Sequence, residues 1–267
     1  MRRLVVLFRT FEHEDEAQVA IRHLRLITRL EEVRAGDLVV GRFSLTPFYE
    51  ALEAEILARG AHLAVPYADA RYIADMDWVK DLKGMTPATW IGGDVSAIPA
   101  DLPHGYFVKG VTHSRKHEWS RCYARTHGEL PGLIEGLRAD PLIGSQAIAV
   151  REFVPLHVYG TTETGLPISE EYRLFVFDGR VMSAGFYWSS YAARFSIEAD
   201  PARIPSAFIA EVISRIPLRH FVMDIGITAD ESPIVIELND PGLCGLSGND
   251  PETLYAALAQ QRIEDNS

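Results

Sequence analysis

The stretch FVMDIGITADESPIVIELND, residues 221–240, contains the clearest structural signal in the chain. Apolar residues alternate with other residues on both sides of the turn sequence ADESP, and this pattern predicts a β-hairpin. If the turn is centred on its Asp-Glu pair, Asp224 lies directly across from Glu237, and Asn239 lies two residues along on the same face. Two carboxylates that face each other in a sheet repel unless a cation lies between them. The hairpin is therefore a candidate metal site.

The same alternation assigns each side chain of the hairpin to one face. The expected apolar face carries Phe221, Met223, Ile225, Ile227, Ile234, Ile236 and Leu238. The opposite face carries the two carboxylates and the amide, and the residues beside them are valines and a glycine rather than lysines. Such an all-oxygen set suits Mg²⁺ or Mn²⁺, and Mg²⁺ commonly binds through few carboxylates plus the phosphates of a nucleotide. A polar face turned to water is the alternative.

A lysine within an apolar strand suggests a phosphate partner. In YFVKGVTHSRK, residues 106–116, Lys109 interrupts an apolar run, and a buried ammonium group without a partner is costly. The loop that follows offers hydroxyl groups, backbone N–H groups and the charges of Arg115 and Lys116, as phosphate-holding loops do. The alternative is a lysine at a strand end that extends its ammonium group to water.

Two further segments could complete a nucleotide site. AIAVREFVP, residues 147–155, reads as a strand that leaves its sheet at Glu152, Phe153 and Val154, where backbone groups could meet the edge of an adenine; an ordinary core strand is the alternative. In EEYRLFVFDG, Arg173 could face a phosphate or a carboxylate with both arms of its guanidinium, or it could pair with Glu171 or Asp178 at the surface. The Asp-Gly dipeptide predicts a hairpin with a type I′ turn.

The order of the predicted elements divides the chain into two parts. Strand and helix alternate through the first third, with strands at 4–8, 37–41 and 61–65 and a first helix at 14–30. This order implies a small parallel sheet with helices against it. Glycines and prolines interrupt the pattern between residues 84 and 105, and longer strands follow. We therefore expect an α/β domain at residues 1–84 and an α+β domain at 85–267.

The composition bounds the class of protein. The formal net charge is −11, from 26 basic and 37 acidic residues, and nucleic-acid binders usually carry a basic face. Two cysteines do not suggest a disulfide framework. The apolar run after Met1 is too short for a signal peptide, and no run is long enough to cross a bilayer. We expect a cytoplasmic protein without a nucleic-acid or membrane partner, and the oligomeric state stays open.

The order of the motifs resembles the ATP-grasp superfamily: a strand lysine, an REFVP-like connector, an EYR strand, and then D-I-G followed by I-E-L-N-D. The first third resembles the Rossmann-like domain that precedes many ATP-grasp domains. The resemblance is closest to a divergent bacterial and phage clade that is related to a eukaryotic translation-initiation assembly factor. That clade is marked by an arginine and two lysines, whose best matches here are Arg173, Lys109 and Lys116. The loop Thr-His-Ser-Arg-Lys departs from the glycine-rich phosphate loop of typical members.

The resemblance implies a fold and a site. ATP is expected between the two lobes of residues 85–267. The implied nucleotide ligands are Lys109, Lys116, Glu152, Phe153 and Val154. The implied ligands of one or two Mg²⁺ ions, or of Mn²⁺, are Asp224, Glu237 and Asn239. The implied catalytic residues are Lys109, on the α- and β-phosphates, and Arg173, which would stabilise the transferred phosphoryl group. No acidic ligand for the ribose is evident, and His157 is a candidate for that place.

The implied reaction is that of a carboxylate–amine ligase. Mg-ATP would phosphorylate a carboxylate, and an amine would attack the acyl phosphate, with a lid near residues 110–120 to exclude water. The substrates could be small molecules, peptides or proteins. Two alternatives stay open at this point. One is an assembly factor that binds a nucleotide and a protein partner, and the other is a small-molecule kinase that stops after phosphate transfer to a hydroxyl group.

Overall fold

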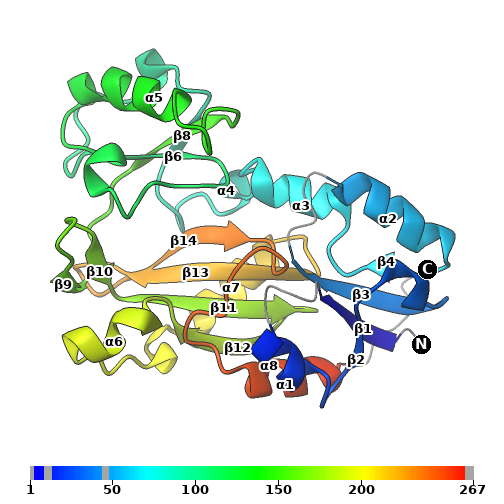
Figure 1. The fold of residues 1–267 in the computed structure, drawn as a ribbon. Coiled ribbons are helices and arrows are strands. Elements are labelled where there is room, and N and C mark those ends of the chain that lie inside the picture. The colour runs from blue at the N-terminus through cyan, green and yellow to red at the C-terminus, as the bar shows by residue number, and fades with distance from the viewer. Residues whose placement is uncertain (1–2, 9–13, 44–47, 262–267) are drawn as a thin grey trace.

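A parallel sheet opens the chain in the computed structural model, which describes residues 3–8, 14–43 and 48–261. Its strands are β1 (Arg3–Phe8), β2 (Arg25–Ile27), β3 (Asp37–Arg42) and β4 (His62–Leu63), in the order β2-β1-β3-β4. Each strand runs parallel to its neighbours. Helices α1 (Glu14–Ala20) and α2 (Tyr49–Ala58) pack on opposite faces. The predicted small parallel sheet with helices against it is therefore confirmed (Figure 1).

The predicted helix over residues 14–30 is wrong beyond Ala20. Helix α1 ends there, and strand β2 pairs with β1 instead. Leu24 and Leu26 pack on one face of the sheet, and Ile27 is buried on the other. The apolar residues of this short stretch therefore follow the strand period of two, which a helical spacing resembles over so few residues.

The predicted junction after residue 84 docks on the hairpin that carries the candidate metal ligands. Helices α3 (Tyr67–Ala74) and α4 (Trp78–Asp81) lead into it. The Val235 N–H of β14 (Pro233–Asn239) donates to the Met85 carbonyl at 2.8 Å, and the Thr86 hydroxyl donates to the Val235 carbonyl at 2.8 Å. The junction thereby pairs the backbone groups of Val235 on the outer edge of β14, where they would otherwise be unpaired.

A small antiparallel sheet follows the junction and lies at the top of Figure 1. Its strands are β5 (Thr89–Ile91), β6 (Tyr106–Gly110), β7 (Tyr123–Ala124) and β8 (Ile148–Glu152), in the order β5-β8-β6-β7. The amphipathic helix α5 (Leu130–Arg138) buries Leu130, Ile134 and Leu137 against it. This sheet has its own apolar core, so the segment from Thr89 to Glu152 forms a lobe of its own.

A larger antiparallel sheet supplies the opposite lobe. Its strands are β11 (Glu171–Phe177), β12 (Arg180–Phe186), β13 (His220–Ile227) and β14, in the order β12-β11-β13-β14. The hairpin β9 (Val158–Thr161) and β10 (Pro167–Ser169) leads into it. Asp178 and Gly179 have φ values of 44° and 73°. Both residues thus have the positive φ of a type I′ turn, which confirms the predicted hairpin.

The large sheet is buried on both faces. One face packs against α6 (Ser189–Phe195) and α7 (Ser206–Arg215), together with α3 and α4. The other face shares a core with the parallel sheet and with α8 (Pro251–Ala259), where Phe175 and Val222 meet Val6 and Leu38. Residues from the first third of the chain therefore complete the core beneath the large sheet.

A β-bulge in β14 changes the predicted faces of the hairpin. The register pairs Asp224 with Glu237, as predicted, but it then shifts, so that Ile225 pairs with Val235. Ile236 is the extra residue, and the faces predicted for the residues before it are exchanged. Val235 is fully buried in the core of the large sheet, and Ile236 turns to the other side, next to Glu237. Alternation alone cannot reveal a one-residue insertion, since each side chain before it simply changes face.

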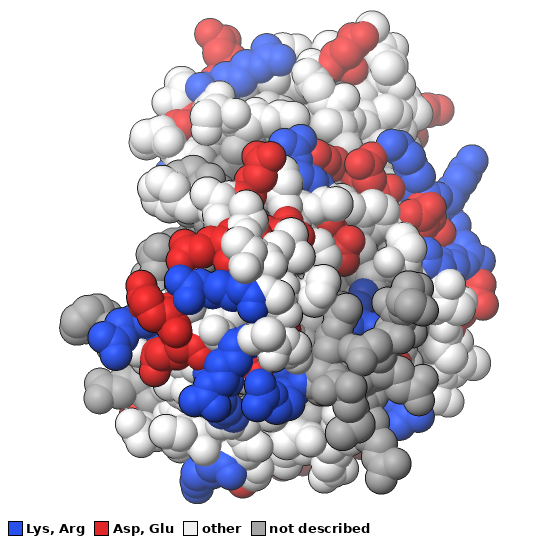
Figure 2. Space-filling model, turned by 90° about the vertical axis from the view of Figure 1, so that its right-hand side faces the viewer, with Lys and Arg blue, Asp and Glu red and all other residues white. Residues whose placement is uncertain are grey.

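Charged side chains of both signs intermingle on the described part of the face shown in Figure 2. Near the parallel sheet, Arg22 pairs with Glu252 at 2.6 Å, and Arg25 pairs with the buried Asp37 at 2.9 Å. In the portion of the chain that the structure describes, no helix combines the length and the apolar character needed to span a membrane.

Candidate active site

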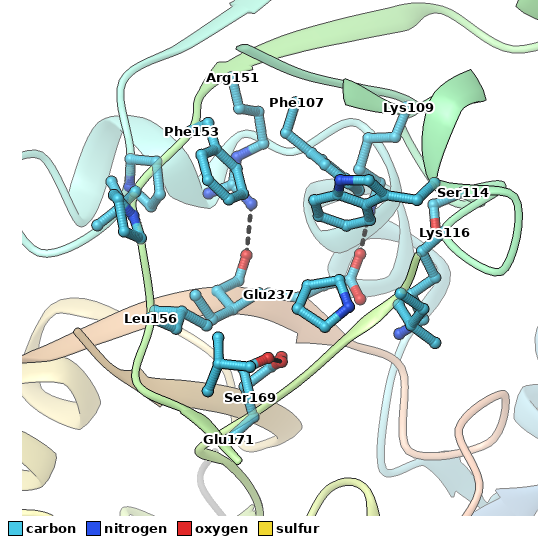
Figure 3. Close-up of a pocket in the computed structure, with 18 of the residues that line it drawn as sticks. Phe107, Lys109, Ser114, Lys116, Arg151, Phe153, Leu156, Ser169, Glu171 and Glu237 are labelled. Carbon is cyan, nitrogen blue, oxygen red and sulfur yellow. Dashed lines mark hydrogen bonds and ion pairs between the residues drawn. The ribbon is translucent and has the colours of Figure 1, made fainter. Parts of the chain in front are cut away.

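A cavity of about 310 Å³ lies between the small sheet and the large sheet (Figure 3). Phe153 and Leu156 stand on one side of it and Lys116 on the other, with Glu237 between them and Glu171 below. Most of the exposed lining is apolar, and the polar groups are few and charged. A concave, largely apolar site with a few convergent polar groups is typical of a small-ligand pocket.

Most of the predicted site residues meet at this cavity. Those that line it are Lys109, Lys116, Glu152, Phe153, Val154 and Glu237. The other predicted residues are Arg173, Asp224 and Asn239, and they lie on the three strands β11, β13 and β14 beside Glu237. The predicted residues thus come together from both lobes, although they span more than a hundred positions of sequence.

Lys109 and Glu237 form an ion pair between the two lobes. Lys109 comes from β6 and is buried, and Glu237 comes from β14 and is partly exposed. Burial alone would raise the pKa of Glu237, but the charges of Lys109 and Lys116 outweigh it and hold that pKa at about 2. The sequence predicted a phosphate as the partner of Lys109. In the structure the carboxylate of Glu237 balances its charge.

A second ion pair, with both partners buried, lies beside the first on the large sheet. Arg173 donates to both carboxylate oxygens of Asp224 at 2.8 Å and to the Gly245 carbonyl at 2.8 Å. Asn239 donates to the same carboxylate at 3.0 Å. Burial alone would lower the pKa of Arg173, but the charge of Asp224 outweighs it and raises that pKa above its ordinary value. Of the two partners predicted for Arg173, a ligand or an acid, the structure provides an acid, and that acid is buried.

The three candidate metal ligands lie close together on β13 and β14. Asp224 lies opposite Glu237, and Asn239 pairs with Val222 on the same two strands. Within residues 3–8, 14–43 and 48–261, no group of three or more His, Cys, Asp or Glu side chains is arranged to hold a metal. Two carboxylates and an amide make an incomplete oxygen shell, which suits Mg²⁺ completed by water and phosphate oxygens better than a closed protein cage.

The loop after β6 is fastened by Asp140. Arg115 donates to both oxygens of this carboxylate at 2.7 Å, and Arg121 donates to it at 2.7 Å. Hydrogen bonds from Arg115 hold the pKa of Asp140 well below its usual range. Arg115 was expected to suit a phosphate, but it turns to Asp140, and the loop residues that line the cavity are Ser114, Lys116 and Trp119.

Lys116 lies on aromatic side chains at the edge of the cavity. Its ammonium group donates to the Tyr187 hydroxyl and lies 4.3 Å from the centre of the Tyr187 ring and 4.7 Å from that of Trp188. Burial alone would lower the pKa of Lys116, but Tyr187 and Glu171 outweigh it, and the pKa is raised. The second lysine of the site is therefore held as a cation.

The connector after β8 forms the aromatic end of the cavity. The N–H groups of Glu152 and Phe153 already donate to the Ala88 and Gly105 carbonyls, at 2.8 and 3.0 Å. The Val154 N–H makes no hydrogen bond to the part of the chain that the structure describes. The Phe153 ring packs at right angles to Trp119, with 5.9 Å between the centroids. Of the predicted connector donors, Val154 is the one that remains available to a ligand.

Glu171 is a site residue that the sequence analysis missed. Its buried carboxylate lines the cavity and accepts hydrogen bonds from the Ser169 hydroxyl and, at 2.9 Å, from the Trp188 indole. Burial raises its pKa, although Lys116 favours the ionised form. The signal was its place two residues before Arg173, since residues i and i+2 share a face of a strand. His157, the predicted ribose candidate, does not line the cavity and contacts Glu170 at 2.9 Å.

Arg151 links the two lobes on the side away from Lys116. It extends from β8 and donates to the Thr86 hydroxyl at 2.7 Å and to the Ile236 carbonyl. That carbonyl belongs to the bulge residue of β14. A bulge leaves a backbone group outside the ladder, and Arg151 from the opposite lobe supplies its hydrogen-bond partner. The orientation of Glu237 therefore depends on a contact between the lobes.

A family model described as "ATP-grasp domain, R2K clade family 3" matches residues 99–258, more than half of the chain. No curated protein sequence matches the chain. Among solved structures, D-cycloserine synthetase DcsG is 15% identical, with a TM-score of 0.62 and coverage of 96% of this chain and 98% of that one. A RimK domain protein ATP-grasp from Sphaerobacter thermophilus is 16% identical, with a TM-score of 0.60 and the same coverage.

The ATP-grasp ligase PsnB has the same fold. It is 14% identical, with a TM-score of 0.56, and it was solved once with its precursor peptide PsnA2 and AMPPNP and once with a minimal precursor, Mg and ADP. The alignments cover 97% and 96% of this chain and 97% of PsnB. The chain therefore belongs to the ATP-grasp domains of R2K clade family 3.

Proposed function

We propose that this enzyme joins a carboxylate to an amine through an acyl phosphate, with ATP bound in the cavity between its two lobes. One observation carries the proposal: two lysines and an ionised carboxylate, Lys109, Lys116 and Glu237, line a cavity in which Phe153 stands on the side opposite Lys116 (Figure 3). A nucleotide has the same division into a flat apolar base and a multiply charged chain of phosphates. No side-chain nucleophile is required for the reaction.

The nucleotide would lie with its base against the connector. Phe107, Trp119 and Phe153 form the aromatic end, and the Val154 N–H would donate to the edge of the adenine. Glu171, at the base of the cavity, would accept hydrogen bonds from the ribose hydroxyl groups. The phosphates would then point toward the lysines, where they would replace Glu237 as the partner of Lys109.

The reaction would proceed in two displacements. An oxygen of the substrate carboxylate attacks the γ-phosphorus of ATP, the bond to the β-phosphate oxygen breaks, and ADP leaves. The amine nitrogen then attacks the acyl carbon, inorganic phosphate leaves, and the nitrogen loses a proton. Lys109 would bind the α- and β-phosphates, and Arg173 would stabilise the transferred phosphoryl group. The residues would act by position and charge.

Asp224, Glu237 and Asn239 would hold Mg²⁺ with the phosphates of ATP. The ion would neutralise phosphate charge in a site where Lys109 and Arg173 now balance the two carboxylates. In this arrangement Arg173 and Asp224 would stay paired. If either side chain moved away, the other would be left as an unpaired charge in a buried place, which is costly.

For the substrates, we propose a peptide or small-molecule carboxylate and an amine. PsnB was solved with a peptide and DcsG is named as a synthetase of a small molecule, so the fold accommodates both classes. We further propose that residues 1–84 form the preceding Rossmann-like domain and that residues 85–267 form the two ATP-grasp lobes. The parallel sheet shares a core with the large sheet, so the two would move together.

Thermal shift measurements test the nucleotide site directly. ATP, ADP and GTP, each with and without Mg²⁺, are compared; a ligand that binds only the folded state raises its stability by about 2.7 kcal/mol at a hundredfold excess over the dissociation constant. We expect the largest shift with Mg-ATP. Peptides and amino acids are then screened for phosphate release, with hydroxylamine as the amine, because an acyl phosphate is converted to a hydroxamate.

A Mg²⁺-dependent shift together with a hydroxamate product would support the ligase reaction. Phosphate transfer that leaves a stable phosphorylated alcohol and no hydroxamate would overturn the acyl phosphate while leaving the ATP site in place. No shift with any nucleotide would overturn the site itself.

A further inference from the structure

Tyr187 stands between the two cations that the proposed mechanism places at the phosphates. Its hydroxyl accepts a hydrogen bond from Lys116, whose ammonium group lies 4.3 Å from the ring centre. The guanidinium carbon of Arg173 lies 4.8 Å from the same centre. The Tyr187 N–H donates to the Glu171 carbonyl at 2.8 Å, which fixes the residue against β11. One aromatic side chain thus touches both Lys116 and Arg173.

Lys116 and Arg173 have different kinds of partner. Arg173 has a carboxylate partner in Asp224. Lys116 has no carboxylate within ion-pair distance among the described residues, and its hydrogen-bond acceptor is the neutral Tyr187 hydroxyl. Cations are attracted to the face of an aromatic ring, and the attraction strengthens away from water. A neutral ring and hydroxyl can therefore hold Lys116 near Arg173 without neutralising its charge, which stays available to an anion.

We propose that Tyr187 is the positioning residue of the phosphate end of the site: its hydroxyl aims Lys116 at the nucleotide, and its ring keeps Lys116 and Arg173 in register. This inference rests on the proposed ATP site. It assigns Tyr187 no contact with the reacting atoms, because Tyr187 does not line the cavity. Its effect passes through Lys116, which does.

A double-mutant cycle on Mg-ATP binding tests the inference. Tyr187→Phe keeps the ring and removes the hydroxyl, and Lys116→Met removes the cation; binding is measured by calorimetry for each variant and for the pair. We expect Tyr187→Phe to weaken Mg-ATP binding by about tenfold. In the Lys116→Met background the same change should cost less than about twofold, because the partner through which it acts is already gone.

Tyr191→Phe is the matched control. Tyr191 contacts Trp188, with 6.1 Å between the ring centroids, but its hydroxyl has no bond to Lys116. We expect wild-type affinity from this variant. Tyr187→Leu, which removes the ring as well, should also slow phosphate release at saturating Mg-ATP, whereas Tyr187→Phe should leave that rate within about twofold of wild type.

The outcomes separate this inference from the function on which it rests. The role of Tyr187 would be overturned if Tyr187→Phe lowered the Mg-ATP affinity equally in both backgrounds, or if it did not lower the affinity in the wild-type background. In either case, binding of Mg-ATP by the wild-type protein would still support the ATP site. A wild-type protein that does not bind Mg-ATP would overturn both.

Discussion

The two walls of the cavity are held in different ways. The loop over residues 111–121 forms part of one wall, and it is fastened by Arg115 and Arg121, both partly exposed, through the single carboxylate of Asp140. The other wall is the large sheet, in which every residue of β13 is buried and Arg173 pairs with Asp224 away from water. One wall is thus held by two partly exposed arginines on a buried carboxylate, and the other by a pair whose two partners are both buried.

This difference predicts how each wall responds to substitution. Water screens a partly exposed arginine more than a buried one, so removing the charge of Asp140 should loosen the loop while the fold is retained. A buried pair whose single partner is removed leaves an uncompensated charge, so the sheet wall should tolerate very little. The loop wall would therefore adjust the affinity for the nucleotide, and the sheet wall would maintain both the fold and the reaction geometry.

The largest effect is expected at the buried pair. Asp224→Ala leaves Arg173 without its partner inside the sheet and should lower the free energy of unfolding by about 3–5 kcal/mol. Urea denaturation measures the loss. The double variant Arg173→Met, Asp224→Leu, which removes both charges, should recover most of that stability and remain inactive. A loss below about 1 kcal/mol in Asp224→Ala would contradict the comparison.

A pH dependence should distinguish the sheet wall next. His220 begins β13, is buried, and lies with its Nδ1 2.7 Å from the Val176 carbonyl. Burial lowers the pKa of His220 from 6.5 to about 4. The imidazole of His220 is therefore protonated near pH 6.5 in the unfolded chain but only near pH 4 in the folded chain. Stability should be complete above pH 6.5 and fall by about 3 kcal/mol as the pH drops to 4.

His220→Asn separates this contribution from that of the carboxylates. Asparagine can still donate to the Val176 carbonyl, but it does not titrate. The free energy of unfolding of wild type and variant is compared from pH 7.5 to pH 4.5. We expect the free energy of unfolding of wild type to fall relative to that of the variant as the pH drops from 6.5 toward 4.5. Parallel curves would show that water reaches this end of the sheet.

Much of the sheet wall was predictable from the sequence, because its pattern is local. The alternation through residues 221–240 gave the pairing of Asp224 with Glu237, and the Asp-Gly dipeptide gave the β11–β12 turn. The bulge at Ile236 was not predictable, since it depends on Arg151 and on the junction at Thr86, both far away in the sequence. Local alternation thus predicted the β13–β14 ladder but not the bulge in β14.

The loop wall was predictable in composition only. Its lysine and hydroxyl groups indicated a phosphate site, but nothing local showed that Arg115 would turn to Asp140, twenty-five positions away. Glu171 was missed for a similar reason. It stood in the sequence as a possible surface partner of Arg173, and only the fold buries it beneath Trp188 and beside Lys116.

Glu237 is the contact between the two walls, and its substitution should have the next largest effect. Glu237→Gln removes a charge from the proposed metal set but little volume, and its amide oxygen can still accept from Lys109. We expect phosphate release to fall by at least about a hundredfold, which corresponds to about 2.7 kcal/mol in the activation barrier. The melting temperature without nucleotide should change by only a few degrees. Full turnover with Mg²⁺ would remove Glu237 from the metal set.

The smallest effect is expected in the loop wall. Asp140→Asn keeps the shape of the side chain but removes the charge that Arg115 and Arg121 share. The loop over 111–121 should loosen, and Lys116 and Trp119 would then become ordered only when the nucleotide binds. Because binding must then also order these side chains, the Mg-ATP affinity should fall by about tenfold. Hydrogen exchange should rise within the loop and stay unchanged in β13.

Acid should have the same effect on the wild-type loop. The pKa of Asp140 lies below its ordinary value because Arg115 favours the carboxylate. The ion pairs of Asp140 with Arg115 and Arg121 therefore stabilise the loop fully above the ordinary carboxyl pKa range. This stabilisation is lost as the pH falls below that range, whereas Asp140→Asn lacks these ion pairs at every pH. The excess exchange of Asp140→Asn over wild type should shrink toward low pH. Equal exchange in the loop and in β13 after the substitution would mean that the two walls unfold together, and the distinction between them would not hold.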